Sequence, residues 1–289
     1  MKRILYLTLL YLLFCYAPAI FSSSPSGSEK NRQIVSDYLV TSGFEHVLNE
    51  YITMLFTYQE NSLSTFIKND SVFASESSKL FYKYFNITSL YYDILSMLSN
   101  SGKRPIEGFL TLGNYQKTKT GKRMTYFENL AFQPSELAKL PEYIESLKNS
   151  PPAKNRVNLI TRLDKAVEGS RISTLMTMGF LKNILIAVNN ALPEKEQTDS
   201  AAIDELIQAH YQKNLPEFES AMQSVYLFTY RMAGDDELKK YVEHCESRSA
   251  RLASLSLATT LLKVFQDVGN SFSGELTKAL DRHRTRMTE

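Results

Sequence analysis

The chain has no tryptophan, only 2 cysteines, and few glycines and prolines, with 11 and 9 among 289 residues. Scarce glycine and proline argue against a turn-dense β-sandwich, because tight turns depend on these residues. The formal net charge is only +2. We therefore expect no nucleic-acid partner, since domains that bind nucleic acids carry a large basic excess.

The cysteines exclude an internal disulfide from most of the chain. Cys15 lies in the apolar N-terminal stretch, so Cys245 has no second cysteine beside it in the rest of the protein. Stability must then come from packing rather than from covalent cross-links. Cys245 falls within a helical pattern, which predicts a small buried side chain rather than a reactive thiol.

The first residues have the order of a secretory signal peptide. Lys2 and Arg3 precede an apolar run, Ile4 to Tyr16, and the small-residue sequence Ala17-Pro18-Ala19 follows. A basic start, a short apolar segment and a small-x-small site define such signals. The sequence predicts a signal peptide at residues 1–19 and an exported protein, periplasmic or secreted.

Two alternatives to a cleaved signal are open. Residues 4–21 approach the roughly 20 apolar residues that cross a bilayer, so they are a candidate inner-membrane anchor. Lipidation of Cys15 is disfavoured, because the large Phe14 precedes it where a small residue is expected. With cleavage, roughly 270 residues remain, enough for a sizeable core, and we expect no transmembrane segment among them.

Beyond the signal, apolar residues recur every three or four positions, as in amphipathic helices, and no sustained alternation indicates a strand. The sequence predicts an all-α helical bundle of two lobes, 20–150 and 151–289, joined at Ser150-Pro151-Pro152. The principal predicted helices are Gln33–Tyr58, Lys79–Leu98, Val157–Leu192, Ala201–Asn214, Glu217–Met232, Glu237–Ser247 and Ala250–Leu280. We expect Asn61–Ser78 to be a loop or a short, weak helix.

Two internal echoes indicate that the lobes are related. Thr41–Phe44 is echoed by Thr177–Phe180, and Glu107–Lys122 can be aligned with Asp236–Arg251. The longer echo shares an acidic residue, apolar positions, a hydroxyl residue, and a small residue followed by a base. Repeated patterns of this kind are typical of duplicated helical units.

The second copy of that echo resembles a known family. Asp236–Arg251 resembles the helix of the small exported bacterial proteins grouped as domain-of-unknown-function family 2059, and Thr118–Lys122 is a partial copy that keeps the glycine. Arg156–Asp164 is similar to the helix that opens the family's domain. Here His244-Cys245 replaces an aromatic pair. The resemblance implies an exported helical protein and no established activity or functional residues.

The chain lacks the usual signatures of catalysis and of metal binding. Its 4 histidines form no H-x-x-x-H pair. His46 and Glu50 lie four residues apart and could hold a weak metal pair, but this spacing is more often a surface hydrogen bond. Gly269–Gly274 misses the nucleophile-elbow pattern by one residue. We therefore expect no catalytic residues, no metal and no cofactor.

Two groups of residues are candidates for binding. The first is a basic run, Lys117, Lys119, Lys122 and Arg123, which would suit an envelope partner: anionic lipid, peptidoglycan or an acidic protein surface. Its simpler interpretation is a solvated helix face or loop. Similarly, the basic residues of the tail, 282–286, are expected to complement the last helical turn.

The second candidate group is aromatic. Phe81, Tyr84, Tyr91 and Tyr92 could line a groove for an apolar ligand or a partner helix, or form a packed core in place of the missing tryptophan.

The sequence thus favours an exported protein with a non-enzymatic interaction or envelope-associated role. A carrier of a small apolar ligand would instead need an enclosed apolar cavity. An enzyme, for example a hydrolase with an unrecognised site, would need convergent polar groups; Glu243, His244 and Asp267 facing one cleft would favour it.

Overall fold

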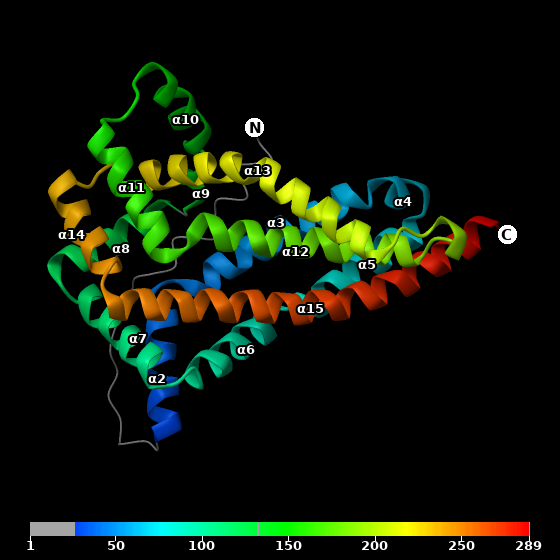
Figure 1. Cartoon of the computed structure of the whole chain (residues 1–289), viewed down its shortest axis with the longest axis horizontal. Helices are drawn as coiled ribbons and strands as arrows, with labels where there is room; N and C mark the ends of the chain where they lie inside the picture. Colours follow the sequence, from blue (N-terminus) through cyan, green and yellow to red (C-terminus); the bar gives the residue numbers. More distant parts are fainter. Residues whose placement is uncertain (1–26, 132, 289) are drawn as a thin grey trace.

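The structure, a computed structural model, describes residues 27–131 and 133–288, and these form helices and connecting turns with no strand (Figure 1). The predicted all-α fold is confirmed. The expected signal peptide, 1–19, and the alternative anchor, 4–21, lie outside the described residues. In chain order the helices are α2 (Gly27–Thr41), α3 (Phe44–Ser62), α4 (Ser64–Asn69), α5 (Ser71–Tyr84), α6 (Ile87–Ser99), α7 (Lys103–Gln116), α8 (Lys119–Ala131), α9 (Pro134–Leu137), α10 (Leu140–Asn149), α11 (Lys154–Val167), α12 (Gly169–Asn190), the 3-10 helix η2 (Glu194–Glu196), α13 (Ser200–Thr229), α14 (Asp235–Cys245) and α15 (Arg248–Thr288).

The long helix α15 organises the molecule. It packs along α12, and α5, α6 and α7 lie against it (Figure 1). Helices from before and after the predicted linker therefore share one hydrophobic core, in which the rings of Phe85, Phe180 and Phe272 contact one another. The linker sequence at Ser150–Pro152 lies outside the helices, between α10 and α11. The division into two lobes stays a prediction.

Among the described helices, α12 alone has the length and hydropathy of a membrane span, and 56% of its apolar window is buried inside the protein. A central core helix has the same composition, because it is covered on most sides by its neighbours.

Two of the predicted helices are each divided by one left-handed residue. Gly43, with φ 65°, separates α2 from α3, and Glu168, with φ 62°, separates α11 from α12. The predictions of unbroken helices at Gln33–Tyr58 and Val157–Leu192 were therefore wrong. The apolar spacing continues through both breaks, so periodicity alone does not reveal them.

The polar segment Asn61–Ser78, which we expected to be a loop or a short, weak helix, is largely helical and contains the short α4 and the first turns of α5. Asp70 caps α5, because its carboxylate accepts hydrogen bonds from the backbone N–H groups of Val72 (2.8 Å) and Phe73 (3.0 Å). Asn86 caps α6 in the same way, accepting from the N–H of Ser89 at 3.0 Å. This cap explains why the predicted helix Lys79–Leu98 is two helices rather than one.

The helices predicted at Ala201–Asn214 and Glu217–Met232 are a single helix, α13, with Pro216 inside it. A proline removes one backbone donor, here the partner of the Gln212 carbonyl. Gln212 is exposed, so water can satisfy that carbonyl and the helix continues. The prediction of a break at this proline was wrong.

The longer sequence echo corresponds to two helix corners with the same hydrogen bonds. At the corner between α7 and α8, the Thr118 hydroxyl accepts from the N–H of Gly121 at 3.1 Å. At the corner between α14 and α15, the Ser247 hydroxyl accepts from the N–H of Ala250 at 3.4 Å. In addition, α7 packs against α15 while α8 packs against α14. Because α7 corresponds to α14 and α8 to α15, the two contacts are equivalent to each other. An approximate two-fold axis between the helix pairs produces this relationship.

The shorter echo has no such counterpart. Gly43 lies at the break between α2 and α3, whereas Gly179 lies in the middle of α12. Both copies fall within helices that we predicted, but only Thr177–Phe180 lies inside one helix. The structural counterpart of Gly43 is instead Glu168, the other left-handed break between two consecutive helices.

Candidate functional site

Three of the predicted basic residues lie together at the corner between α7 and α8. Lys117 follows the last residue of α7, Lys119 begins α8, and Lys122 is one turn further on. All three side chains are exposed, and none forms an ion pair within the described residues. No aspartate or glutamate occurs between Glu107 and Glu128. We call Lys117, Lys119 and Lys122 the basic corner.

Arg123, the fourth predicted basic residue, has structural contacts. Its guanidinium lies 3.3 Å from the carboxylate of Glu237 on α14 and 5.4 Å from the ring centroid of Phe127. It therefore joins α8 to α14, and its charge is partly neutralised there. The predicted run thus separates into three solvated lysines and one paired arginine.

Close packing holds the corner in place. A Cβ atom at Gly121 would lie 2.1 Å from the carbonyl oxygen of Tyr115, so only glycine fits where α8 passes the end of α7. Tyr115 in turn stacks on His244 of α14, with ring centroids 3.7 Å apart. Burial lowers the pKa of His244 to about 4. The imidazole is therefore neutral at pH 7, and the charge of the corner comes from its lysines.

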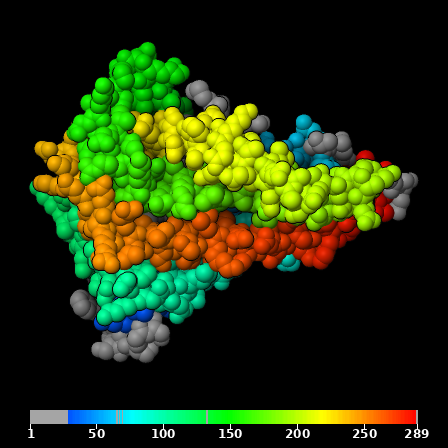
Figure 2. Space-filling model, viewed as in Figure 1, coloured from blue at the N-terminus to red at the C-terminus, as the bar shows by residue number. Residues whose placement is uncertain are grey.

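The corner ends of both helix pairs lie at one end of the molecule, far from the C-terminus (Figure 1). In the space-filling view the teal surface of α7 adjoins the orange surface of α14 and the start of α15 at the left (Figure 2).

A buried carboxylate lies behind the corner, and the sequence did not reveal it. Glu128 is 2% exposed, and its Oε1 accepts hydrogen bonds from the hydroxyls of Tyr230 (2.5 Å) and Tyr241 (2.7 Å). The three side chains join α8, α13 and α14. The sequence pattern that could have identified Glu128 is its position on the same helical face as Met124 and Ala131, which are both buried.

Cys245 lies in the same region and is buried, as predicted. Burial raises the pKa of its thiol, so the thiol stays protonated at neutral pH. Because the thiolate is the nucleophilic form, this cysteine is an inert part of the core.

Two arginines of α11 fix the position of α14. Arg156 donates to Asp235 (2.7 Å) and to the carbonyl of Ala233 (2.9 Å). Arg162 binds both carboxylate oxygens of Glu246, at 2.9 and 2.6 Å, and this pairing holds the pKa of Glu246 below its usual value. Bidentate pairs of this kind restrict orientation as well as distance.

The predicted aromatic residues do not come together as one site. Phe81 is 0% exposed, and it stacks on Phe85 in the core. Tyr84 is half-buried against Phe272. Tyr91 lines a groove of about 600 Å³ at the break between α2 and α3, whereas Tyr92 is 54% exposed. The hypothesis that these four aromatic residues line a ligand groove stays a prediction.

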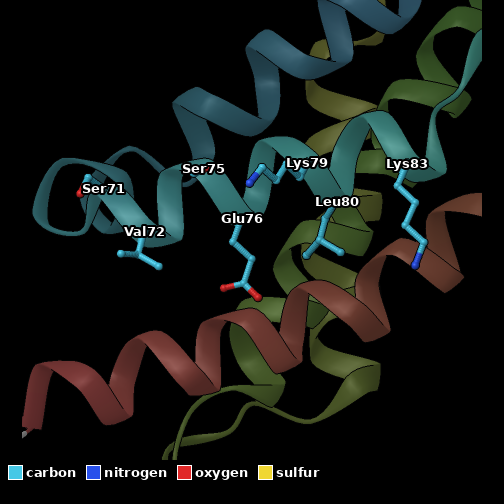
Figure 3. Close-up of a pocket in the computed structure, with 7 residues that line it drawn as sticks. All are labelled: Ser71, Val72, Ser75, Glu76, Lys79, Leu80 and Lys83. Atoms are coloured by element: carbon cyan, nitrogen blue, oxygen red, sulfur yellow. The ribbon is translucent and has the colours of Figure 1, made fainter.

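A second groove, of about 660 Å³, runs along α5. Figure 3 shows Val72, Glu76 and Leu80 on the side of α5 that faces α15. The Glu76 carboxylate is already paired with Arg282, and the ammonium of Lys83 lies over the ring of Tyr84. Two charged side chains that line this groove, Glu76 and Lys83, therefore have protein partners.

The basic tail contacts other helices rather than only its own last turn. Asp70 accepts hydrogen bonds from His283 (2.8 Å) and Arg286 (2.7 Å), and Arg284 donates to the carbonyl of Ala191 at 2.6 Å. The tail thus fastens the end of α15 to α5 and α12.

The residues that would favour an enzyme are not gathered in a cleft. Glu243 and Asp267 are exposed and lie near lysines of their own helices, at 3.9 and 2.7 Å, while His244 stacks on Tyr115. Within the described ranges, no three histidine, cysteine or acidic side chains are grouped as metal ligands would be.

No protein-family model, no curated protein and no solved structure matches this chain. The resemblance to domain-of-unknown-function family 2059 stays a prediction.

Proposed function

We propose that this protein is an exported, non-enzymatic binding protein that associates with an anionic surface of the cell envelope. The observation that carries this proposal is the basic corner. Its three exposed lysines have no ion pair within the described residues, and they project from a closely packed helix corner.

The expected affinity is modest and depends on salt. A lysine near an anionic lipid surface contributes about 1 kcal/mol, so three contribute about 3 kcal/mol. Exposed charges are screened over about 10 Å at 0.1 M salt. The association is therefore reversible and weakens as the ionic strength rises.

The proposal is tested by sedimentation of the protein, residues 20–289, with vesicles that contain phosphatidylglycerol. The variant Lys117→Gln/Lys119→Gln/Lys122→Gln removes the three charges without changing the core. We expect its partition coefficient to be roughly a hundredfold lower. Equal binding of the variant and the unchanged protein would contradict the proposal.

The matched control is Lys165→Gln/Lys195→Gln/Lys213→Gln. These three lysines are also exposed and lie on α11, η2 and α13. The net charge changes by the same amount, so a loss of binding in both variants would indicate an effect of overall charge rather than of the corner.

Export has its own test. We expect the protein purified from its native source to begin at Ile20, because the proposed signal ends at Ala19. Intact Met1 on an envelope-bound protein would instead support the anchor at residues 4–21.

The carrier and hydrolase alternatives have less support. Phe81 is fully buried among other rings, as in a packed core rather than in the wall of a cavity. The polar groups that would favour an enzyme, Glu243, His244 and Asp267, have separate partners rather than one shared site.

A further inference from the structure

The exposed face of α8 combines charge with an apolar side chain. Lys119, Lys122 and Tyr126 occupy one face, because residues three and seven positions apart lie on the same side of a helix. Tyr126 is 57% exposed, on the side of α8 opposite the residues that α8 buries in the core. Bases beside an exposed ring suit the boundary between lipid headgroups and acyl chains.

The start of α15 repeats this arrangement. Arg248, Arg251 and Leu255 are exposed, and Leu255 is 49% exposed. Their spacing is the same as on α8: a base at the first residue of the helix, a base three residues later, and an apolar residue seven residues later. Arg248 is the first residue of α15, as Lys119 is of α8.

The two faces occupy equivalent places in the fold. The hydroxyl-capped turns before them have the same hydrogen bonds, at Thr118 and at Ser247. The sequence alignment that pairs these two turns also pairs the two exposed faces, and it pairs the buried Met124 with the buried Ala253. The repeat therefore includes both what is buried and what is exposed.

The bases of α15 are available for a partner. Neither Arg248 nor Arg251 forms an ion pair within the described residues. Glu246 lies close enough for Arg251 to contribute to the lowering of its pKa. However, both oxygens of that carboxylate are already bound by Arg162.

We propose that Arg248, Arg251 and Leu255 form a second copy of the lipid-binding face on α8, and that both copies contact a bilayer with anionic headgroups. The proposal rests on the proposed function and names its ligand class. Guanidinium groups suit lipid phosphates, because they donate two parallel hydrogen bonds. The adjacent apolar side chains enter the headgroup boundary.

The test compares vesicle binding of Arg248→Gln/Arg251→Gln with that of Lys195→Gln/Lys213→Gln, which removes two exposed charges elsewhere. Each base near an anionic surface contributes about 1 kcal/mol, which is a factor of about five. We expect the first variant to bind phosphatidylglycerol vesicles at least fivefold more weakly than the control. Arg248→Lys/Arg251→Lys should keep most of the binding.

Three outcomes separate this inference from the proposed function. If Arg248→Gln/Arg251→Gln binds like its control while Lys119→Gln/Lys122→Gln binds weakly, the second face is overturned and the proposed function stands. If the unchanged protein does not bind anionic vesicles, both are overturned. The remaining outcome supports the inference. Each pair variant alone binds phosphatidylglycerol vesicles more weakly than the unchanged protein, and the variant that combines Lys119→Gln, Lys122→Gln, Arg248→Gln and Arg251→Gln binds them no more tightly than it binds phosphatidylcholine vesicles.

The apolar part of the proposal has a separate readout. Leu255→Ser and Tyr126→Ser should each weaken binding to vesicles in high salt, where the charges are screened. No change at high salt in either variant would overturn the claim that these side chains enter the bilayer.

Discussion

The ring of Tyr115 lies flat on the imidazole of His244, with centroids 3.7 Å apart and planes 7° from parallel. The alignment of Glu107–Lys122 with Asp236–Arg251 pairs these two residues, which lie near the ends of α7 and α14. Their contact therefore lies where the two helix corners meet, close to the approximate two-fold axis.

The stack should couple the two corners energetically. Tyr115→Ala and His244→Ala should each lower the free energy of unfolding by about 1–2 kcal/mol, with a coupling of about 0.5–1.5 kcal/mol in a double-mutant cycle. Chemical denaturation measures both quantities. Tyr126→Ala, which removes an exposed ring, is the control; a coupling of zero between Tyr115 and His244 would contradict the role assigned to the stack.

His244 should make the protein less stable in mild acid. Its pKa falls from 6.5 to about 4 because of burial, so below pH 6.5 the unfolded chain binds a proton that the folded protein does not. The contribution of the neutral His244 to the free energy of unfolding is complete above pH 6.5 and is lost progressively as the pH falls to about 4. We expect His244→Phe to flatten this part of the curve of unfolding free energy against pH. An unchanged slope would show that other groups cause it.

Glu128 should be a strong determinant of stability. Glu128→Leu removes this acceptor from the hydroxyls of Tyr230 and Tyr241, and the loss of a buried hydrogen-bond partner costs about 1–3 kcal/mol for each. We expect thermal unfolding to show a loss of about 2–4 kcal/mol.

Removing both hydroxyls in that background provides the matched test. Glu128→Leu/Tyr230→Phe/Tyr241→Phe should recover most of the lost stability, because replacing all partners by apolar groups is nearly neutral. Leu257 fills the equivalent buried position of α15, so leucine is compatible with this packing. Failure of the triple variant to recover would indicate that the carboxylate acts through other contacts.

Asp70 should control the attachment of the tail. Its hydrogen bonds to His283 and Arg286 hold its pKa well below the usual range. A lowered carboxylate pKa stabilises the folded state above the unfolded value, and this contribution is lost as the pH falls. Asp70→Asn should therefore accelerate amide exchange in residues 281–288 at neutral pH. Asp281→Asn, which affects a pair within one helix, should not.

The sequence predicted the fold class well and the helix boundaries poorly. The all-α fold followed from apolar spacing over long segments. By contrast, the break at Glu168 depends on one backbone angle, and the start of α5 depends on the side-chain cap at Asp70. Neither feature changes the hydrophobic pattern, so periodicity did not reveal them.

The candidate site was partly predictable. Charge alone identified Lys117, Lys119 and Lys122, but the pairing of Arg123 with Glu237 required the neighbouring helix. Glu128 was missed because its partners lie on α13 and α14, about a hundred residues away in the chain. The echo between the two corners was visible, whereas the contact between them was not.

The most direct measurement is the partition of the protein, residues 20–289, between solution and vesicles as the phosphatidylglycerol fraction rises from zero. The account predicts binding that increases with the anionic fraction, weakens with salt, and is roughly a hundredfold weaker in the variant Lys117→Gln/Lys119→Gln/Lys122→Gln. Binding that is absent at every lipid composition, or that is unaffected by these substitutions, would contradict it.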